Sequence, residues 1–186
     1  MYETKPADTL TVADYLSGEK DSEVRHEYLY GEVYALAGAT AFHNLIMTNI
    51  VRALGNAAAE SPRRIYSSDM KVRVSDEIFY YPDVMVACGP LADAYFETAP
   101  CVVVEVLSKS TARRDRFEKR LAYQEIESLQ LYLAVDSRKR AVRGLYRTES
   151  GWQERVFEAG QSIPAPCLES ELTFTELYAK VRFSSS

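Results

Sequence analysis

Apolar and polar residues along the chain follow helical spacing in some segments and strand spacing in others. The clearest helical stripe runs from Thr40 to Glu60, and Pro62 ends it, so this pattern predicts a long helix. Helical spacing also predicts a short helix at Thr9 to Leu16, a helix from about Ala112 to Glu127, and a short closing helix at Thr173 to Val181.

Runs rich in β-branched and aromatic residues predict strands between these helices. Cys101–Leu107 and Leu129–Val135 are continuous apolar runs, typical of strands buried on both faces. With a helix between them, they predict parallel neighbours joined by a right-handed crossover. The other predicted elements are a strand pair turning at Gly31 (Val24–Leu29, Glu32–Leu36), strands Ile65–Val74 and Ile78–Cys88, a loop Gly89–Pro100 with room for a helical turn at Leu91–Tyr95, and a hairpin (Ala141–Arg147, Trp152–Phe157).

This order of elements predicts a mixed α/β or α+β fold, with a central mixed sheet flanked by helices. The helix at 40–60 is expected on one face of the sheet and the helix at 112–127 on the other. No repeat or linker interrupts the pattern, so residues 1–186 are expected to form a single domain with its core at about 9–181.

The composition and the cysteines indicate the cellular compartment in which the protein is expected. The chain has 186 residues, of which 47% are hydrophobic and 26% charged, ordinary values for a globular protein. It has neither an apolar run of about 18 residues nor a secretory signal pattern at its beginning. Cys88, Cys101 and Cys167 lack metal-ligand spacing, and two of them lie within apolar runs. Reduced core thiols and a cytoplasmic location are therefore expected.

The net charge of −5 argues against a broad basic face that coats nucleic acid. A local basic site is still compatible with this charge. Two basic clusters are present, and each could equally be a solvated face. They are Arg113, Arg114, Arg116, Lys119 and Arg120, and then Arg138 to Arg140 with Arg143 and Arg147.

Two acidic residues interrupt the apolar strand patterns. Asp83 follows Pro82 within the predicted strand 78–88, and Glu105 lies inside the run 101–107. A charged residue in such a run costs free energy unless it is paired or binds a metal. Two carboxylates at strand ends therefore suggest a divalent metal site.

The chemistry expected of that site is phosphodiester hydrolysis. Mg²⁺ or Mn²⁺ takes oxygen ligands and keeps several waters, so Asp83, Glu105 and the backbone carbonyl of Val106 would suffice to bind it. The cation would neutralise charge on the phosphoryl group and activate water. Lys119 lies on one helical stripe with Asp115 and Tyr123, and its ammonium could steady the developing charge.

Each residue also has a purely structural interpretation. Asp83 could cap backbone amides in a turn, and Glu105 could be a buried acid paired with an arginine. Lys119 could be only the i,i+4 partner of Asp115. The metal site is predicted from the three together.

The chain resembles the PD-(D/E)XK nucleases in its pair Pro82-Asp83, followed later by Glu105-Val106-Leu107. It resembles more closely the Uma-type family of bacterial restriction-endonuclease-like proteins, long catalogued as a domain of unknown function. The resemblance runs from about Thr9 to Val181. It rests on Arg25 to Val33, His43, Tyr81 to Val84, Val104 to Thr111, Asp115, Lys119, Tyr123 and Leu131 to Asp136.

The resemblance implies a restriction-endonuclease-like core and further site residues. In the PD-(D/E)XK motif the lysine stands two residues after the second acid, and this chain has Leu107 at that position. The Uma-type family instead takes its lysine from the next helix, and this resemblance implies Lys119. Lys71 and Lys109 are the less favoured substitutes. An N-terminal glutamate often completes such sites, and Glu27 is preferred to Glu32. His43 could be a general base or phosphate contact, or only a packing residue.

The predicted activity is metal-dependent cleavage of DNA. One site per chain suggests a homodimer for cutting both strands. Two alternatives stay open: a catalytically silent nucleic-acid-binding or assembly protein with the same fold, and a metal-dependent hydrolase of another phosphoester.

Overall fold

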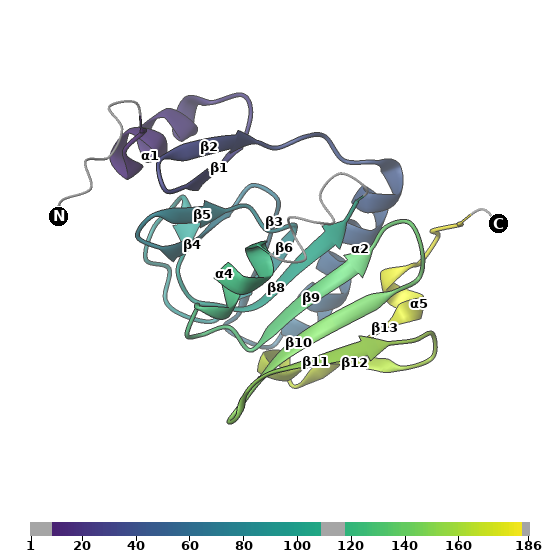
Figure 1. Cartoon of the computed structure of the whole chain (residues 1–186). Coiled ribbons are helices and arrows are strands. Elements are labelled where there is room, and N and C mark those ends of the chain that lie inside the picture. The colour runs from purple at the N-terminus through teal and green to yellow at the C-terminus, as the bar shows by residue number, and fades with distance from the viewer. Residues whose placement is uncertain (1–8, 109–117, 184–186) are drawn as a thin grey trace.

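The structure is a computed structural model that describes residues 9–108 and 118–183 (Figure 1). The helical elements are α1 (Val12–Asp21), α2 (Ala41–Ala58), α4 (Arg120–Gln124), the 3₁₀ turn η2 (Pro166–Leu168) and α5 (Phe174–Leu177). The strands are β1 (His26–Leu29), β2 (Glu32–Ala35), β3 (Arg64–Ser67), β4 (Lys71–Ser75), β5 (Ile78–Tyr80), β6 (Val84–Ala87), β7 (Phe96–Glu97), β8 (Pro100–Leu107), β9 (Leu131–Asp136), β10 (Val142–Thr148), β11 (Gly151–Phe157), β12 (Ser162–Ala165) and β13 (Ser170–Thr173).

The predicted mixed α+β class is confirmed, but the strands form three sheets rather than one. A six-stranded sheet has the order β11-β10-β9-β8-β6-β3, a five-stranded sheet has the order β2-β1-β5-β4-β7, and β12 pairs with β13. Strand β8 lies inside the six-stranded sheet, antiparallel to β6 and parallel to β9 as predicted.

Alternation along β8 separates two apolar cores. Val102, Val104 and Val106 pack on one face with α2, whereas Val103 and Leu107 pack on the other face with the region around α4. Helices therefore cover both faces, as predicted, with α2 behind the sheet and α4 in front of it in Figure 1. Every residue of β8 is buried, as its apolar run indicated.

The five-stranded sheet shares the core on the α4 face. Its residues Val72 and Tyr80 pack in one cluster with Met85 and Tyr132 of the six-stranded sheet. This packing brings the first hairpin of the chain close to the central strand.

Two strands predicted as continuous are each broken in two. Ile65–Val74 divides into β3 and β4 because Ser68 adopts φ 42°, which no strand accommodates. Ile78–Cys88 divides into β5 and β6 around Pro82, which has no N–H for a strand ladder. In both cases the two halves lie in different sheets. Asp83 consequently lies at the break, just before β6.

The first hairpin and the long helix agree with the prediction. Leu29 pairs with Glu32 across the two turn residues, Tyr30 and Gly31, which both have positive φ. A Cβ on Gly31 would lie 2.7 Å from the Cβ of Thr9, so glycine is required there. The Thr40 side chain accepts a hydrogen bond from the His43 backbone N–H and thereby caps α2.

The other helices differ from the prediction at their ends. Helix α1 begins at Val12, after its N-cap Thr11, and continues beyond Leu16. The helix predicted to reach Glu127 ends at Gln124, and its predicted start lies outside the described residues. The closing helix is reduced to α5, and β12, η2 and β13 before it were not predicted. Residues 91–95 form no helical turn.

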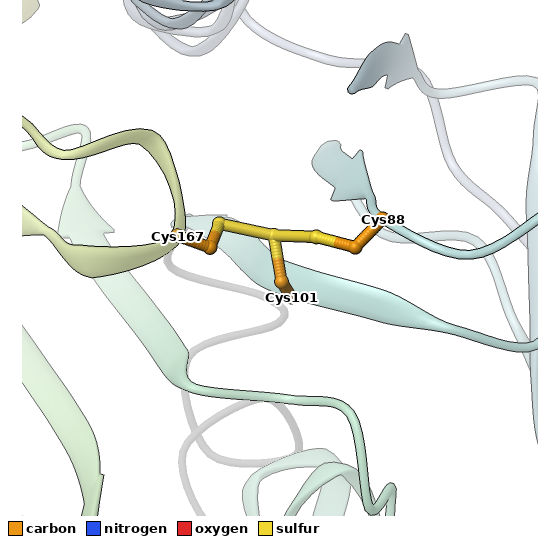
Figure 2. A group of neighbouring side chains, drawn as sticks. All are labelled: Cys88, Cys101 and Cys167. Atoms are coloured by element: carbon orange, nitrogen blue, oxygen red, sulfur yellow. A yellow bond between two sulfur atoms is a disulfide. The ribbon is translucent and has the colours of Figure 1, made fainter. Parts of the chain in front are cut away.

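The three cysteines, expected from the sequence to be reduced core thiols, lie together in one cluster. The sulfur of Cys101 lies between those of Cys88 and Cys167 and could form a disulfide with either one (Figure 2). Strand breaks and a turn near the end of the chain, which hydrophobic spacing did not indicate, bring these residues together. Separately, no helix among the described residues is long and apolar enough to cross a membrane.

Candidate active site

A cavity of about 480 Å³ opens beside the carboxyl end of β8. Its wall includes the predicted site residues His43, Asp83, Glu105, Val106 and Lys119. The segment between β2 and α2 and the start of α2 form much of the remainder. The cavity is thus built from elements that are far apart in the sequence, around the end of the central strand.

Asp83 lies across from Glu105 in the strand register, because Val84 pairs with Val104 in the antiparallel β6–β8 ladder. Its Oδ2 atom accepts a hydrogen bond of 2.7 Å from the Val106 backbone N–H. The same oxygen lies 3.3 Å from Nε2 of His43, in the first turn of α2. These two contacts fix the carboxylate at the cavity wall, where its side chain remains 21% exposed.

Lys119 joins two buried glutamates. Its Nζ atom lies 2.7 Å from Oε1 of Glu27 and 3.3 Å from Oε1 of Glu105. The three side chains are between 1% and 6% exposed. Lys119 is therefore more than an i,i+4 partner of Asp115, because its ammonium is buried between carboxylates from β1 and β8. Asp115 lies outside the described residues.

Tyr123 completes this cluster at the Glu105 oxygen that Lys119 also contacts. Its hydroxyl donates a hydrogen bond of 2.9 Å to Glu105 Oε1, and its side chain is fully buried. Burial raises the pKa of the Tyr123 hydroxyl well above 10, and the negative charges of Glu105 and Glu27 raise this pKa further. The hydroxyl therefore stays protonated and serves as a permanent donor.

The structure distinguishes Glu27 from Glu32. Glu27 is 1% exposed, and its Oε1 atom accepts a hydrogen bond of 3.3 Å from the Tyr81 backbone N–H as well as the contact with Lys119. Glu32 is exposed on β2, where the Tyr34 hydroxyl donates to it. The two glutamates lie on the same face of the hairpin, because Leu29, two residues from Glu27, pairs with Glu32. They differ because Glu32 lies on β2, the exposed edge strand of the sheet, and Glu27 is the one in the cluster.

The substitute lysines have other positions. Lys71 is buried on β4, and its Nζ atom lies 3.2 Å from the hydroxyl of Tyr81, which in turn donates to Glu19. Burial lowers the pKa of Lys71. Lys71 lines a smaller neighbouring cavity, and Lys109 lies outside the described residues. Tyr81 and Glu19 were missed from the sequence; the position of Tyr81 directly before Pro82-Asp83 was the available signal.

The second basic cluster is largely neutralised within the protein. Arg138 pairs with the buried Asp136, and Arg143 pairs with Glu154. Arg147 donates to backbone carbonyls, including that of Leu129. The structural interpretation of this cluster therefore fits better than a nucleic-acid contact.

The donor atoms around the cavity suit a hard divalent cation. Asp83 and Glu105 offer carboxylate oxygens at one wall, and Val106 lies beside both. Oxygen donors of this kind are what Mg²⁺ and Mn²⁺ prefer. Among the described residues, the three cysteines are the only group of three candidate ligands whose ligand atoms lie within 4.8 Å of one another. Within this part of the chain, no three carboxylates of this site come that close together. The residues present therefore fit a site of one or two protein carboxylates completed by water.

The fold of the chain is similar to that of a solved structure. It matches a crystal structure from Anabaena variabilis described as "a putative nuclease belonging to DUF820", with a TM-score of 0.73 over 91% of this chain and 97% of that one. At 16% identity this likeness concerns the fold. The model of the Uma2 family, described as "Putative restriction endonuclease", matches residues 12–177, and the chain belongs to that family.

Two proteins of Synechocystis sp. are similar in sequence. The uncharacterized protein slr1290 is 29% identical over 182 residues, which cover 96% of each chain. The uncharacterized protein sll1609 is 35% identical over 132 residues, which cover 68% of this chain and 75% of that protein.

Proposed function

We propose that this protein is a metal-dependent endonuclease that hydrolyses phosphodiester bonds of DNA. The observation that carries the proposal is the position of the Lys119 ammonium, which contacts both Glu27 and Glu105 beside a cavity that Asp83 also lines. Membership in the Uma2 family supports a nuclease in the broad sense. The proposed dependence on metal rests on the chemistry of these side chains, and the proposed choice of DNA rests on the family's description as restriction endonucleases.

Asp83 and Glu105, together with the carbonyl oxygen of Val106, would hold one Mg²⁺ or Mn²⁺ ion. Such an ion, when bound, withdraws charge from a phosphoryl oxygen and makes a bound water more acidic. His43 and the Val106 N–H hold the Asp83 carboxylate in one orientation, so the ligand is positioned before any ion binds.

Lys119 would carry out the role of the superfamily's lysine. Its ammonium can donate to an attacking water or to the phosphoryl oxygen on which negative charge develops. Glu27 contacts the ammonium directly, and the Tyr123 hydroxyl donates to Glu105, the second carboxylate that contacts Lys119. These contacts keep the charged groups oriented within a poorly hydrated environment, where electrostatic interactions are strong.

Cleavage of both DNA strands by one site per chain requires two sites at the duplex, so the proposal includes a homodimer. The cytoplasmic location expected from the sequence is compatible with a DNA substrate and stays a prediction.

The test is relaxation of supercoiled plasmid by the purified chain with Mg²⁺ or Mn²⁺, with EDTA as the control. Nicked and linear products that appear only with the metal support the proposal. Retarded plasmid migration without cleavage would indicate a silent DNA-binding protein instead. Hydrolysis of a small phosphodiester such as bis-p-nitrophenyl phosphate without DNA cleavage would indicate a hydrolase of another phosphoester.

A further inference from the structure

Cys88, Cys101 and Cys167 meet at the end of β8 remote from Glu105. The Cα atom of Cys101 lies 6.0 Å from that of Cys88 and 6.3 Å from that of Cys167, and both separations suit a disulfide. Figure 2 shows the Cys101 sulfur between the other two. Since one sulfur forms one disulfide at a time, the two pairings are alternatives, and each leaves a third cysteine as a thiol.

A β-bulge places Cys101 in this position. In the β6–β8 ladder Val86 pairs with Val102 and Ala87 pairs with Pro100, so Cys101 is the extra residue. Regular alternation would give Cys101 and Val102 opposite faces, yet both pack in the core beneath α2, where Cys167 also lies. Because the bulge redirects the side chain towards Cys167, the shared sulfur is a specific feature of the backbone.

The three cysteines differ sharply in their access to solvent. Cys101 is 1% exposed and Cys167 is 4% exposed, whereas Cys88 lies on the surface just after β6. A solute can therefore reach Cys88 directly, but it cannot reach Cys101 or Cys167 directly. The order of access is Cys88, then Cys101, then Cys167.

The surroundings favour a disulfide over a metal centre. Cys101 and Cys167 belong to an apolar cluster, in which a neutral disulfide is buried without cost for charge, while a metal centre would hold both of their thiolates in that core at the same time. Structural zinc sites also require a fourth ligand. Among the residues that the structure describes, the group contains the three cysteines alone.

We propose that these cysteines form a disulfide relay that accepts oxidising equivalents from a low-molecular-weight disulfide at Cys88 and passes them inward to Cys167. The Cys88 thiolate attacks the small disulfide, forming a mixed disulfide and releasing one small thiol. The Cys101 thiolate then attacks the Cys88 sulfur, forming the Cys88–Cys101 bond and releasing the second small thiol. Overall, one small disulfide is reduced and two protein thiols are oxidised.

The last step is an exchange without net oxidation. The Cys167 thiolate attacks the Cys101 sulfur, the Cys88–Cys101 bond breaks, and its electron pair leaves on Cys88, which takes a proton from water. The bond thereby moves from a link between neighbouring strands to a link between β8 and η2. Oxidation at the surface would thus secure the C-terminal segment to the central sheet.

The experiment uses the full chain, fully reduced and then exposed to mixtures of reduced and oxidised glutathione. Samples are quenched with acid at intervals, alkylated, and mapped by peptide mass spectrometry. We expect glutathione on Cys88 first, then the Cys88–Cys101 bond, and finally the Cys101–Cys167 bond with one alkylated thiol. The Cys167→Ser variant should stop at the second species, and Cys101→Ser should stop at glutathione on Cys88.

The Cys88→Ser variant tests the access route. It keeps both buried cysteines, and we expect it to form the Cys101–Cys167 bond at least about tenfold more slowly than the unmodified chain, because no exposed thiolate remains. An equal rate would overturn the relay. A Cys88–Cys167 bond, three thiols that stay reduced in oxidised glutathione, or one bound zinc that protects all three from alkylation would overturn it as well. The wild-type time course decides these outcomes even if a variant fails to fold.

Discussion

The Nζ atom of Lys119 lies 2.7 Å from Oε1 of Glu27, although the two residues come from the segment before α4 and from the first hairpin. Both side chains are almost completely buried. The contact joins the five-stranded sheet to the helix on the six-stranded sheet, at the cavity where Asp83 and Glu105 lie. Folding of the N-terminal hairpin therefore completes the candidate site.

Glu27→Gln should reduce plasmid cleavage by about 100-fold, because a neutral amide no longer orients the Lys119 ammonium by charge. The matched control is Glu32→Gln on the next strand of the same hairpin. That side chain is exposed, so its replacement should change the cleavage rate by no more than about twofold. If both variants lose the same share of the cleavage rate, Glu27 has no specific role in the site.

Lys119→Met should abolish cleavage and also lower the free energy of unfolding. The substitution leaves Glu27 and Glu105 buried without their shared cation, and breaking a buried pair costs about 3–5 kcal/mol. Arg143→Met is the control, since its ion pair with Glu154 is largely exposed and should contribute at most about 1 kcal/mol. Urea unfolding measures both values.

A double variant separates charge from packing in that experiment. Adding Glu27→Gln to Lys119→Met removes one of the two uncompensated carboxylates and should restore part of the lost stability. If the double variant is no more stable than Lys119→Met alone, the stabilising role assigned to the buried ion pair is incorrect.

The sequence predicted the parts of the site that depend on local pattern. The apolar run at 101–107 correctly indicated a central strand that carries Glu105, and the stripe at 40–60 correctly placed His43 in the first turn of a long helix. The pairing of Glu27 with Lys119 could be inferred only from a family resemblance, because contacts between remote elements leave no periodic signal.

Other features depended on backbone breaks. A positive φ at Ser68 and the missing N–H of Pro82 divided two predicted strands between sheets. Hydrophobic spacing is insensitive to such single residues, so the second sheet was not predicted. The burial of Lys119 and the cysteine cluster at Cys101 were missed for the same reason, since both result from packing between sheets or from a bulge.

Mn²⁺ should raise the melting temperature of the wild-type chain, because the ion binds only the assembled site. At a tenfold excess over Kd the gain is about 1.4 kcal/mol, or about 3–6 °C for a chain of this size. Asp83→Asn should remove this gain, while its remaining carbonyl oxygen can still accept the Val106 N–H. An unchanged metal-dependent shift in the variant would show that Asp83 only caps that backbone amide.

Tyr123 should make the protein sensitive to high pH. The pKa of its hydroxyl is raised well above 10 in the folded state, whereas an unfolded tyrosine ionises near 10. The unfolded chain therefore loses a proton that the folded chain keeps, and the stability contributed below pH 10 is lost as the pH rises further. The stability difference between wild type and Tyr123→Phe should shrink between about pH 9 and 11 in urea unfolding. A constant difference would contradict this coupling.

The most direct test of the proposed nuclease is the rate at which Glu105→Gln relaxes supercoiled plasmid in Mn²⁺, relative to wild type at an equal folded fraction. Glu105 is at once the proposed metal ligand and the partner of both Lys119 and Tyr123, and glutamine keeps its shape without its charge. We predict metal-dependent cleavage by the wild type and a loss of at least about 100-fold in the variant. Cleavage by a folded Glu105→Gln protein at the wild-type rate would contradict the assignment of this cavity as the active site.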